Sequence, residues 1–432
     1  MMLNVFWFRR DLRLEDNAGL YHALRDGLPV LPVFIFDENI IETLQDPSDA
    51  RITFIHDEIF RLKNQLELNG SSLCVKYGAP VEVFQKLAHE YTIRTVYTNH
   101  DYELYAIERD TSVEKHLKSL EIAFKTFKDQ VIFEKNEIVK DSGKPYTVFT
   151  PYSRKWKELF QQHQIQSFLS EQLAGDFIKT PPFPLPELES FGFTRGVRMI
   201  PPREVDREVI RNYDLFRDFP GVSGTSRLSV HLRFGTISIR RLVMTAAELN
   251  EVFLNELIWR EFYMMILWHY PHVAHSSFKK DYDRIIWRNH EDEFTAWCQG
   301  QTGYPLVDAG MRELNQTGYM HNRARMVTAS FLTKHLLIDW RWGEAYFAEK
   351  LMDYELSSNN GGWQWAAGTG CDAAPYFRVF NPALQAAKFD PENKYILQWV
   401  PELNTPKYPH KIVEHAAARK RAIEAYKSAL QK

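Results

Sequence analysis

The stretch Asp353–Arg378, DYELSSNNGGWQWAAGTGCDAAPYFR, holds the least ordinary grouping of side chains in the sequence. Two asparagines, two glycines and two tryptophans fall within Asn359–Trp365, and the acidic residues Asp353 and Glu355 precede them. A glycine pair allows unusual backbone conformations and lets the backbone approach a ligand closely. A lone Trp-x-Trp most often marks a buried loop with two core aromatics. Polar groups among aromatics need hydrogen-bond partners, however, and a polar, planar ligand would supply them.

A second group of chemically capable side chains lies in the apolar run NELIWREFYMMILW, where Glu256, Trp259 and Arg260 fall within about one helical turn. Residues three apart on a helix share a face, so Glu256 and Trp259 point the same way. Charges on an apolar helix need partners, because an unpaired buried charge is costly. Two interpretations remain open: an ion pair at the helix edge, or a contact with a polar ligand.

The segment GTSRLS, residues 224–229, places small hydroxyl side chains before a helical stretch. Such side chains cap helices, and the free N–H groups at a helix start also attract phosphate. The residues alone favour simple capping.

The bulk properties bound the class of protein. A chain of 432 residues suggests two or three domains at roughly 150 residues per domain. The net charge of −3 at pH 7 excludes a globally basic nucleic-acid binder, so any DNA site must be a local basic patch. An aromatic content of 14% suits a site that stacks planar rings, and it suits a large aromatic core equally well.

The three cysteines, Cys74, Cys298 and Cys371, are isolated, and no C-x-x-C occurs. We therefore expect no metal site and no disulfide framework. Scattered thiols suit a reducing compartment. The N-terminus has no signal-peptide pattern, and no apolar run reaches the roughly 20 residues of a membrane span. We expect a cytoplasmic protein that does not bind a membrane.

Strand and helix signals alternate through residues 1–130. A short apolar run covers residues 5–8, strands are predicted at 29–36, 72–76 and 95–97, and helices at 50–69, 80–91 and 103–120. This alternation predicts an α/β domain with an open, mostly parallel, Rossmann-like sheet. No G-x-G-x-x-G occurs, so nothing here marks dinucleotide binding.

The rest of the chain is predicted to be a connector followed by helices. Residues 131–204 include Lys179–Ser190, with four prolines in twelve residues, typical of an extended surface segment. From 205 to 432 helix-period runs recur at 238–254, 256–270, 305–314, 326–337 and 343–352, with no strand pattern. The tail, 410–432, is predicted to be a basic helix with a solvated face. We therefore predict an all-α domain over 205–432.

The motif NNGGWQWAAGTGCDAAPYFRVFNP closely resembles the flavin- and DNA-binding region of the photolyase/cryptochrome family. WFRRDLRLEDN, KPYTVFTPY, GTSRLSVHLRFG, NELIWREFY and GYMHNRARM resemble the family in the same order, so the resemblance covers nearly the whole chain. It is strongest to class I cyclobutane pyrimidine dimer photolyases. It implies an antenna-type α/β domain, a helical FAD-binding domain, a monomer, and light-driven repair of UV-damaged DNA by electron transfer from excited, reduced FAD.

The resemblance assigns the GTSRLS segment to the FAD diphosphate, which reverses the preference for capping. It also implies that Arg325 pairs with Asp353, and that Arg217 is the second partner of this aspartate. The positions that match cofactor contacts are Tyr213, Thr225, Ser226, Arg227, Leu228, Ser229, Phe253, Glu256, Arg260, Tyr319, Asn322, Arg325, Asp353, Tyr354, Glu355 and Asn359.

Further positions match residues of the reaction and of DNA binding. Those matched to the reaction are Glu256, Asn322, Met326, Asn359 and the electron-transfer tryptophans Trp363, Trp340 and Trp287. Those matched to DNA or the lesion are Arg217, Glu256, Trp259, Arg260, Asn322, Arg323, Met326, Trp365, Arg378 and Lys388. The resemblance implies that Trp259 and Trp365 stack on the lesion. Arg323, Arg378 and Lys388 are candidate phosphate contacts, which position DNA without reading its sequence.

Three matched residues favour repair of cyclobutane dimers. Relatives that repair (6-4) photoproducts carry histidines where this chain has Asn322 and Met326. Plant blue-light receptors of the family carry Asp at the position of Asn359, and an amide cannot donate a proton as an acid can. Asn359 therefore suits a flavin kept reduced or as a neutral radical. The alternatives are a cryptochrome-type photoreceptor and a (6-4)- or DASH-type photolyase.

The resemblance weakens at the antenna chromophore. Folate-binding relatives carry an Asn-Glu pair where this chain has Tyr105 and Ala106, and a lysine where it has His275. A folate antenna is therefore not expected. A deazaflavin, a second flavin or no antenna all stay open.

Overall fold

The computed structural model describes residues 1–431, and the chain divides into two compact units. The first unit comprises residues 1–134, 158–205 and 228–245. The second comprises residues 135–157, 206–227 and the chain from 246 onward. Each unit draws on three separate stretches. The division into 1–130, 131–204 and 205–432 stays a prediction from sequence beside these units.

A five-stranded, all-parallel sheet with the order β3-β2-β1-β4-β5 forms the centre of the first unit. The strands are β1 Met2–Phe8, β2 Val30–Asp37, β3 Cys74–Gly78, β4 Thr92–Asn99 and β5 Ala123–Phe127. In register, Val5 of β1 lies beside Leu31 on one side and Val96 on the other. The predicted α/β class with a parallel sheet is confirmed, and after β5 the described chain forms only helices and irregular segments.

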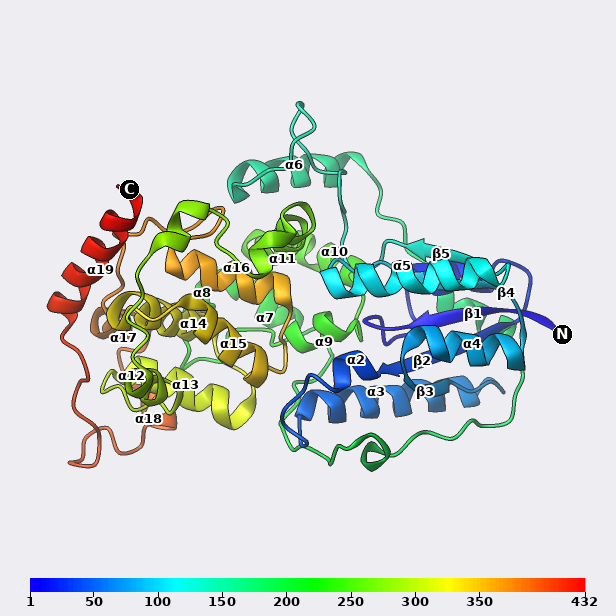
Figure 1. The fold of residues 1–432 in the computed structure, drawn as a ribbon, viewed down its shortest axis with the longest axis horizontal. Helices are drawn as coiled ribbons and strands as arrows, with labels where there is room; N and C mark the ends of the chain where they lie inside the picture. The colour runs from blue at the N-terminus through cyan, green and yellow to red at the C-terminus, as the bar shows by residue number, and fades with distance from the viewer. Residues whose placement is uncertain (432) are drawn as a thin grey trace. The chain divides into compact units, whose positions relative to one another are not determined.

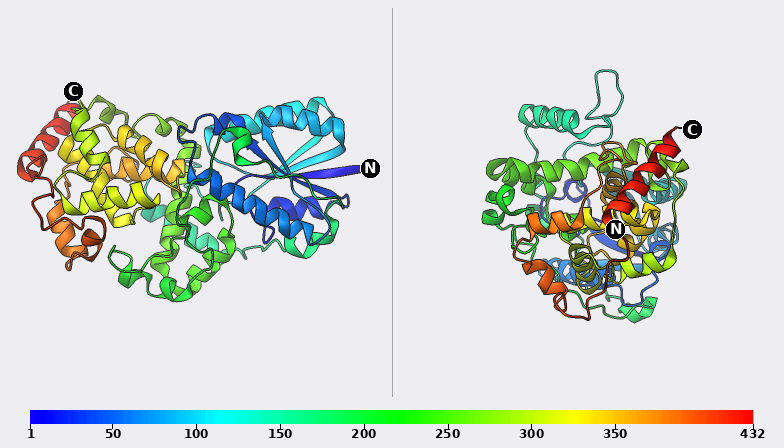
Figure 2. Two further views of the ribbon diagram at one scale, coloured as in Figure 1. Left: turned by 90° about the horizontal axis from the view of Figure 1, so that it is seen from below. Right: turned by 90° about the vertical axis from the view of Figure 1, so that its left-hand side faces the viewer.

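Helices cover both faces of this sheet (Figures 1 and 2). Val83, Phe84 and Leu87 join the same apolar cluster as Val5 and other odd-numbered residues of β1. On the opposite face lies the helix that contains Gly19. A Cβ added at Gly19 would lie 2.9 Å from the Phe6 ring, so the absence of a side chain lets this helix pack closely on the sheet. The helices of this unit are α1 Ala18–Leu24, α2 Glu38–Ile41, α3 Ala50–Glu67, α4 Pro80–Glu90, α5 Leu104–Ser119, η1 Ser170–Asp176, η2 Leu188–Phe191 and α9 Ser229–Phe234.

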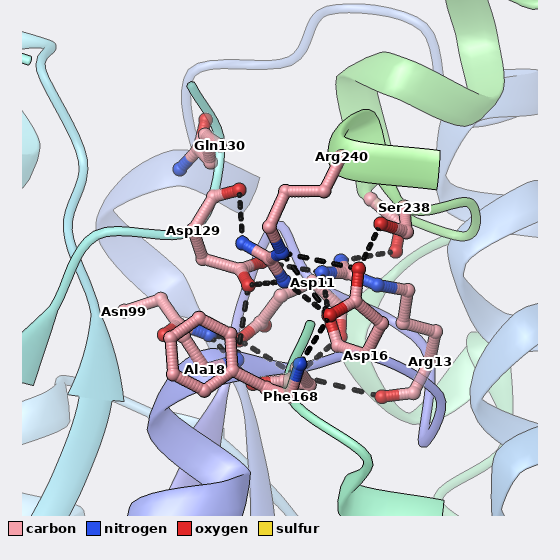
Figure 3. A network of polar contacts seen from close by, with 12 residues as sticks. Asp11, Arg13, Asp16, Ala18, Asn99, Asp129, Gln130, Phe168, Ser238 and Arg240 are labelled. Atoms are coloured by element: carbon pink, nitrogen blue, oxygen red, sulfur yellow. Dashed lines mark hydrogen bonds and ion pairs between the residues drawn. The ribbon is translucent and has the colours of Figure 1, made fainter. Parts of the chain in front are cut away.

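A buried polar network joins Asp11, Arg13 and Asp16 of the RRDLRLEDN stretch to Asp129 and Arg240 (Figure 3). The Arg240 guanidinium donates to Asp129 Oδ1 at 2.8 Å and to Asp16 Oδ2 at 3.0 Å, and Arg13 donates to Asp129 Oδ2 at 2.7 Å. Burial raises the pKa of the Asp11 carboxyl. Because these charges pair with one another, we assign the network a role in holding the fold together and not a role in the reaction.

The second unit is helical. It contains the start of α6 Phe149–Gln162 and the end of α10 Ile239–Leu249. Its other helices are α7 Arg207–Arg211, α8 Tyr213–Phe216, α11 Glu251–His269, η3 Pro271–Ala274, η4 Lys280–Arg284, α12 Glu291–Cys298, α13 Pro305–Thr317, α14 Asn322–Ser330, η5 Phe331–Leu336, α15 Trp340–Lys350, α16 Leu356–Ala367, α17 Pro382–Phe389, α18 Lys394–Trp399 and α19 His415–Leu430.

Several predicted elements differ from the structure. The run 238–254 is two helices, because Asn250 adopts an extended conformation and its side chain accepts from the Val252 and Phe253 N–H groups. The run 326–337 is an α-helix followed by the π-helix η5. The Asn-Asn-Gly-Gly-Trp stretch, whose Trp-x-Trp suggested a buried loop, lies inside α16. Helix α6 was not predicted within the connector.

No helix within residues 1–431 combines the length and the apolar character that a membrane crossing requires. Over the same residues, no cluster of His, Cys, Asp and Glu side chains could hold a metal ion.

Candidate active site

Helix α11 presents the predicted acid and aromatic of the site. Glu256 forms an ion pair with Arg217, which directly follows α8. Burial raises the pKa of the Glu256 carboxyl although Arg217 acts in the opposite direction. Arg217 was expected beside Asp353. The structure instead pairs it with Glu256, because α8, which Arg217 directly follows, packs beside α11.

Two further acid–base pairs lie in the second unit. Arg325 of α14 contacts both carboxylate oxygens of Asp353, at 2.9 and 3.2 Å, and donates to the Met320 carbonyl at 2.7 Å. Arg260 of α11 donates to Glu355 Oε1 at 3.2 Å, just before α16 begins. The predicted contact between Arg325 and Asp353 is therefore present. These pairs tie α11, α14 and α16 together around the same region.

Asn359 is held in one orientation by its amide nitrogen. Nδ2 donates to the Glu344 carboxylate at 2.8 Å and to the Glu344 carbonyl at 3.1 Å. Both amide hydrogens are thus used within the protein, so the Oδ1 oxygen is the atom left to accept a hydrogen bond. Burial raises the pKa of the Glu344 carboxyl, and the Asn359 amide opposes that rise.

The two glycines of α16 serve different purposes, and neither has a positive φ. A Cβ added at Gly361 would lie 2.2 Å from the Tyr263 ring, so glycine allows this ring to pack on the helix. A Cβ added at Gly362 would meet no atom within 4 Å. An open space beside Gly362 and an acceptor oxygen at Asn359 fit a planar ligand that carries an N–H group, such as a reduced flavin.

Helix α14 begins with the predicted pair Asn322 and Met326. These residues lie four apart, and Asn322 Nδ2 approaches Met326 Sδ to 4.0 Å. Burial lowers the pKa of His321 to about 4, so its neutral Nδ1 accepts from the Arg323 N–H at 3.1 Å and caps the helix. The Arg323 side chain donates to Asp218 at 2.6 Å and stacks on the Phe389 ring at 4.0 Å.

The predicted phosphate segment lies at a junction in the chain. Thr225, Ser226 and Arg227 belong to the second unit, whereas Leu228 and Ser229 belong to the first, at the start of α9. No side chain caps α9, so the hydroxyls do not serve the capping role that the residues alone favoured. Arg227 adopts φ 51° and lies 5.0 Å from the Tyr319 ring. The remaining predicted cofactor positions, Tyr213 and Phe253, form an edge contact at 5.0 Å, and Tyr354 follows Asp353 directly.

The predicted electron-transfer tryptophans occupy one apolar region of the second unit. Trp363 and Trp340 are 2% and 1% exposed in the same cluster, and Trp287 packs against it. A Cβ added at Gly343 would lie 2.1 Å from the Trp363 ring, so glycine permits this close approach. The ring neighbours of Trp363 include Trp297, at 6.0 Å, which the motifs had not singled out.

The second predicted lesion-stacking residue, Trp365, borders a small recess that is open to solvent. Tyr263, Phe278, Gly361 and Cys371 are among the residues around it. The other predicted DNA contacts lie further along the chain, where Arg378 stacks on Phe380 at 5.5 Å and Lys388 lies 5.0 Å from the Phe389 ring.

Sequence reasoning missed three residues that support this region. Phe149 stacks on Trp259, Asp218 binds Arg323, and Glu344 orients Asn359. Phe149 lies in the motif KPYTVFTPY, but the motif does not indicate its partner. Asp218 and Glu344 carried no local signal, since each acts through a partner that only the fold brings close, Arg323 in one case and Asn359 of the next helix in the other.

Comparison with known proteins accounts for this arrangement. Residues 4–171 match the DNA photolyase family, and residues 253–407 match the FAD binding domain of DNA photolyase. A deoxyribodipyrimidine photo-lyase from Halobacterium salinarum is 37% identical along an alignment that covers 99% of this chain and 99% of its own.

Two solved structures share the whole fold. A class III photolyase from Agrobacterium tumefaciens superposes with a TM-score of 0.86 at 31% identity, covering 100% of this chain and 98% of its own. An archaeal photolyase from Sulfolobus tokodaii, which holds two FAD molecules, gives 0.81 at 35% identity over 99% and 100%. With its parallel sheet, its FAD-binding domain and relatives matched along their full length, the chain belongs to the DNA photolyase family.

Proposed function

We propose that this protein repairs cyclobutane pyrimidine dimers in DNA by a light-driven reaction that requires FAD. The observation that carries the proposal is the pair Glu256 and Trp259 on one face of α11, an acidic side chain beside a planar indole. A carboxylate that can accept from a pyrimidine N–H group, beside a planar indole, suits a base with a polar edge and a flat face. The relative from Halobacterium salinarum, a deoxyribodipyrimidine photo-lyase, supports the same conclusion.

The chain's own residues would hold the cofactor and tune it. When bound, reduced FAD supplies the electron that splits the dimer after light is absorbed. Asp353 and Glu355 are neutralised by Arg325 and Arg260, so the region keeps its polar contacts without a net charge. The Asn359 oxygen, fixed by Glu344, would accept from a ligand N–H group. These contacts favour a flavin kept reduced.

The lesion would be flipped out of the duplex, since chemistry on a base requires it to leave the stack. Trp259 and Trp365 would offer the aromatic surfaces, and Asn322 and Met326 the polar and apolar contacts between them. Base stacking on an aromatic ring contributes about 1–3 kcal/mol per base. Arg217 would be released from Glu256 when this carboxyl group turns to the dimer.

Arg323, Arg378 and Lys388 would hold the phosphates on either side of the flipped nucleotide. The tryptophans Trp363, Trp340 and Trp287 would return the oxidised cofactor to its reduced state. One chain supplies all of these residues, so we propose a monomer. Within residues 1–431 the three cysteines are free thiols, and free thiols suit a cytoplasmic location.

Repair of a defined lesion tests the proposal. The photoreduced protein is incubated with an oligonucleotide that carries one thymine cyclobutane dimer, under blue light and in darkness, beside an oligonucleotide with a (6-4) photoproduct. Light-dependent loss of the cyclobutane dimer alone is the expected result. A protein that binds FAD and photoreduces it but repairs neither lesion would instead be a photoreceptor.

A further inference from the structure

We infer that Phe149 is a positioning residue for Trp259, which it backs with its own ring so that one indole face is left for the lesion. The inference rests on the proposed function, in which Trp259 stacks on the dimer. It gives the motif KPYTVFTPY, whose residues the proposed function does not otherwise use, a place in damage recognition.

The contact between the two rings is a close, parallel stack. The ring centroids of Phe149 and Trp259 lie 3.7 Å apart, and the planes differ by 5°. Phe149 also places an edge against Phe262, at 5.9 Å and 77°. Phe262 is fully buried, at 0% exposure, so Phe149 is braced against the core on that side.

The direction of this stack follows from the geometry of α11. Successive residues of a helix are about 100° apart, so Trp259 lies between Glu256 on one flank and Phe262 on the other, each about 60° away, and Glu261 lies beyond Phe262. Helix α6 covers the Phe262 side: Tyr152 contacts Phe262 at 5.1 Å, and Trp156 donates to Glu261 at 2.6 Å.

Because Phe149 starts α6 and reaches both Trp259 and Phe262, it approaches the indole from the side of Phe262. Its ring therefore covers the indole face that is turned away from Glu256. The opposite face, which the Tyr263 ring borders at 5.3 Å with a tilt of 34°, would receive the base.

Phe149 is itself fixed by the loop that follows the second tryptophan. Its backbone N–H donates to Asp372 Oδ2 at 3.0 Å, which satisfies the first free donor of α6. Asp372 also borders the recess beside Trp365. One carboxylate thus joins the support of Trp259 to the surroundings of Trp365, so the spacing between the two aromatic surfaces is set before DNA arrives.

The test compares binding of dimer-containing and undamaged duplexes by Phe149→Leu, Phe149→Tyr and the neighbouring control Val148→Ala, whose parent side chain is 44% exposed. Leucine fills space but cannot stack. We expect Phe149→Leu to bind the dimer duplex about threefold to tenfold more weakly, the size of one aromatic pair, with unchanged binding of undamaged DNA. Phe149→Tyr and Val148→Ala should bind both duplexes as the parent protein does.

A double-mutant cycle separates positioning from general damage to the fold. In a Trp259→Leu background, Phe149→Leu should have no further effect, because there is no indole left to orient. Asp372→Ala, which leaves the Phe149 ring in place but removes its anchor, should weaken dimer binding in the same direction by a smaller factor. This variant keeps the inference testable if Phe149→Leu does not fold.

Three results would overturn the inference: equal weakening on both duplexes, additive effects of the two leucines, or tighter dimer binding by Phe149→Leu. The last would mean that Phe149 occupies the place of a base in the free protein. If the parent protein bound the dimer-containing and the undamaged duplex equally, the proposed function itself would be contradicted, independently of these variants.

Discussion

Arginines meet carboxylates pair by pair around the candidate site. Glu256 binds Arg217, Glu355 binds Arg260 and Asp353 binds Arg325. Such pairing avoids leaving a charge unpaired, which is the costly state for a group removed from water. It also means that DNA or the lesion must compete with an internal partner before it can use Glu256 or Arg217.

The same competition applies to Arg323, which Asp218 binds at 2.6 Å. The Asp218 side chain is 41% exposed, and pairs of this kind contribute up to about 1 kcal/mol. Asp218→Asn should therefore strengthen binding to undamaged DNA about threefold to fivefold, as fluorescence anisotropy would measure. Asp214→Asn is the matched control, since Asp214 lies close by in α8 and accepts from Asn250 rather than from an arginine. Equal affinities for the two variants would show that Arg323 is not held back by Asp218.

The buried tryptophan Trp363 carries the prediction about photoreduction. Trp363→Phe keeps an aromatic ring but removes the readily oxidised indole. Light-driven reduction of oxidised FAD should slow strongly, whereas repair by chemically reduced protein should stay largely intact. Trp297→Phe is the control, because Trp297 touches Trp363 but lies outside the predicted path. Absorbance during illumination gives the first rate and dimer loss gives the second; a parallel fall in both would remove Trp363 from the reduction path.

At the level of elements, helix α16 shows what a sequence can and cannot predict. Asn359, Asn360, Gly361 and Gly362 are poor helix formers, and their run with Trp363 suggested a loop. Tertiary contacts hold them in a helix: Asn360 donates to the Val273 carbonyl at 2.8 Å, and the helix backbone packs against other rings. Local propensity does not contain these contacts.

The three inner strands and the long helices of the first unit were predictable because their apolar patterns are clear and their ends carry turn residues. The edge strand β5 was not predicted, because most of its side chains are exposed and it carries no apolar run. Most site residues were found through motifs, which identify a residue but not its partner. Arg217 was assigned to the wrong carboxylate for that reason. The stack of Phe149 on Trp259 joins two segments far apart in the sequence, so no local pattern could indicate it.

The two glycines of α16 give a paired prediction about this element. Gly361→Ala should lower the free energy of unfolding by about 1–3 kcal/mol, because the new methyl group would collide with the Tyr263 ring. Gly362→Ala meets open space, so it should raise the stability of the FAD-free protein by about 0.5–1 kcal/mol through helix propensity. Denaturant unfolding of the FAD-free proteins measures both. If FAD uses the space beside Gly362, the second variant should also retain less FAD; full retention would place the cofactor elsewhere.

For the whole molecule, electrostatics decides how DNA binding must work. A chain with a net charge of −3 repels DNA on average, so attraction must come from a few local cations. The basic tail helix α19 is one source of positive charge, and the region of Arg378 is another. The two can be told apart because each phosphate contact adds to the salt dependence of binding.

Arg378→Ala should weaken binding to every DNA sequence alike and make the dependence of log K on log salt shallower by about 0.9, the loss of one phosphate contact. Lys427→Ala removes the same charge from α19, whose basic face is predicted to be solvated, and should change neither the affinity nor the slope. Titrations at several salt concentrations, with undamaged and dimer-containing duplexes, measure both quantities. If Lys427→Ala lowered the slope and Arg378→Ala did not, the DNA would run along the tail helix, and the set of phosphate contacts would have to be reassigned to α19.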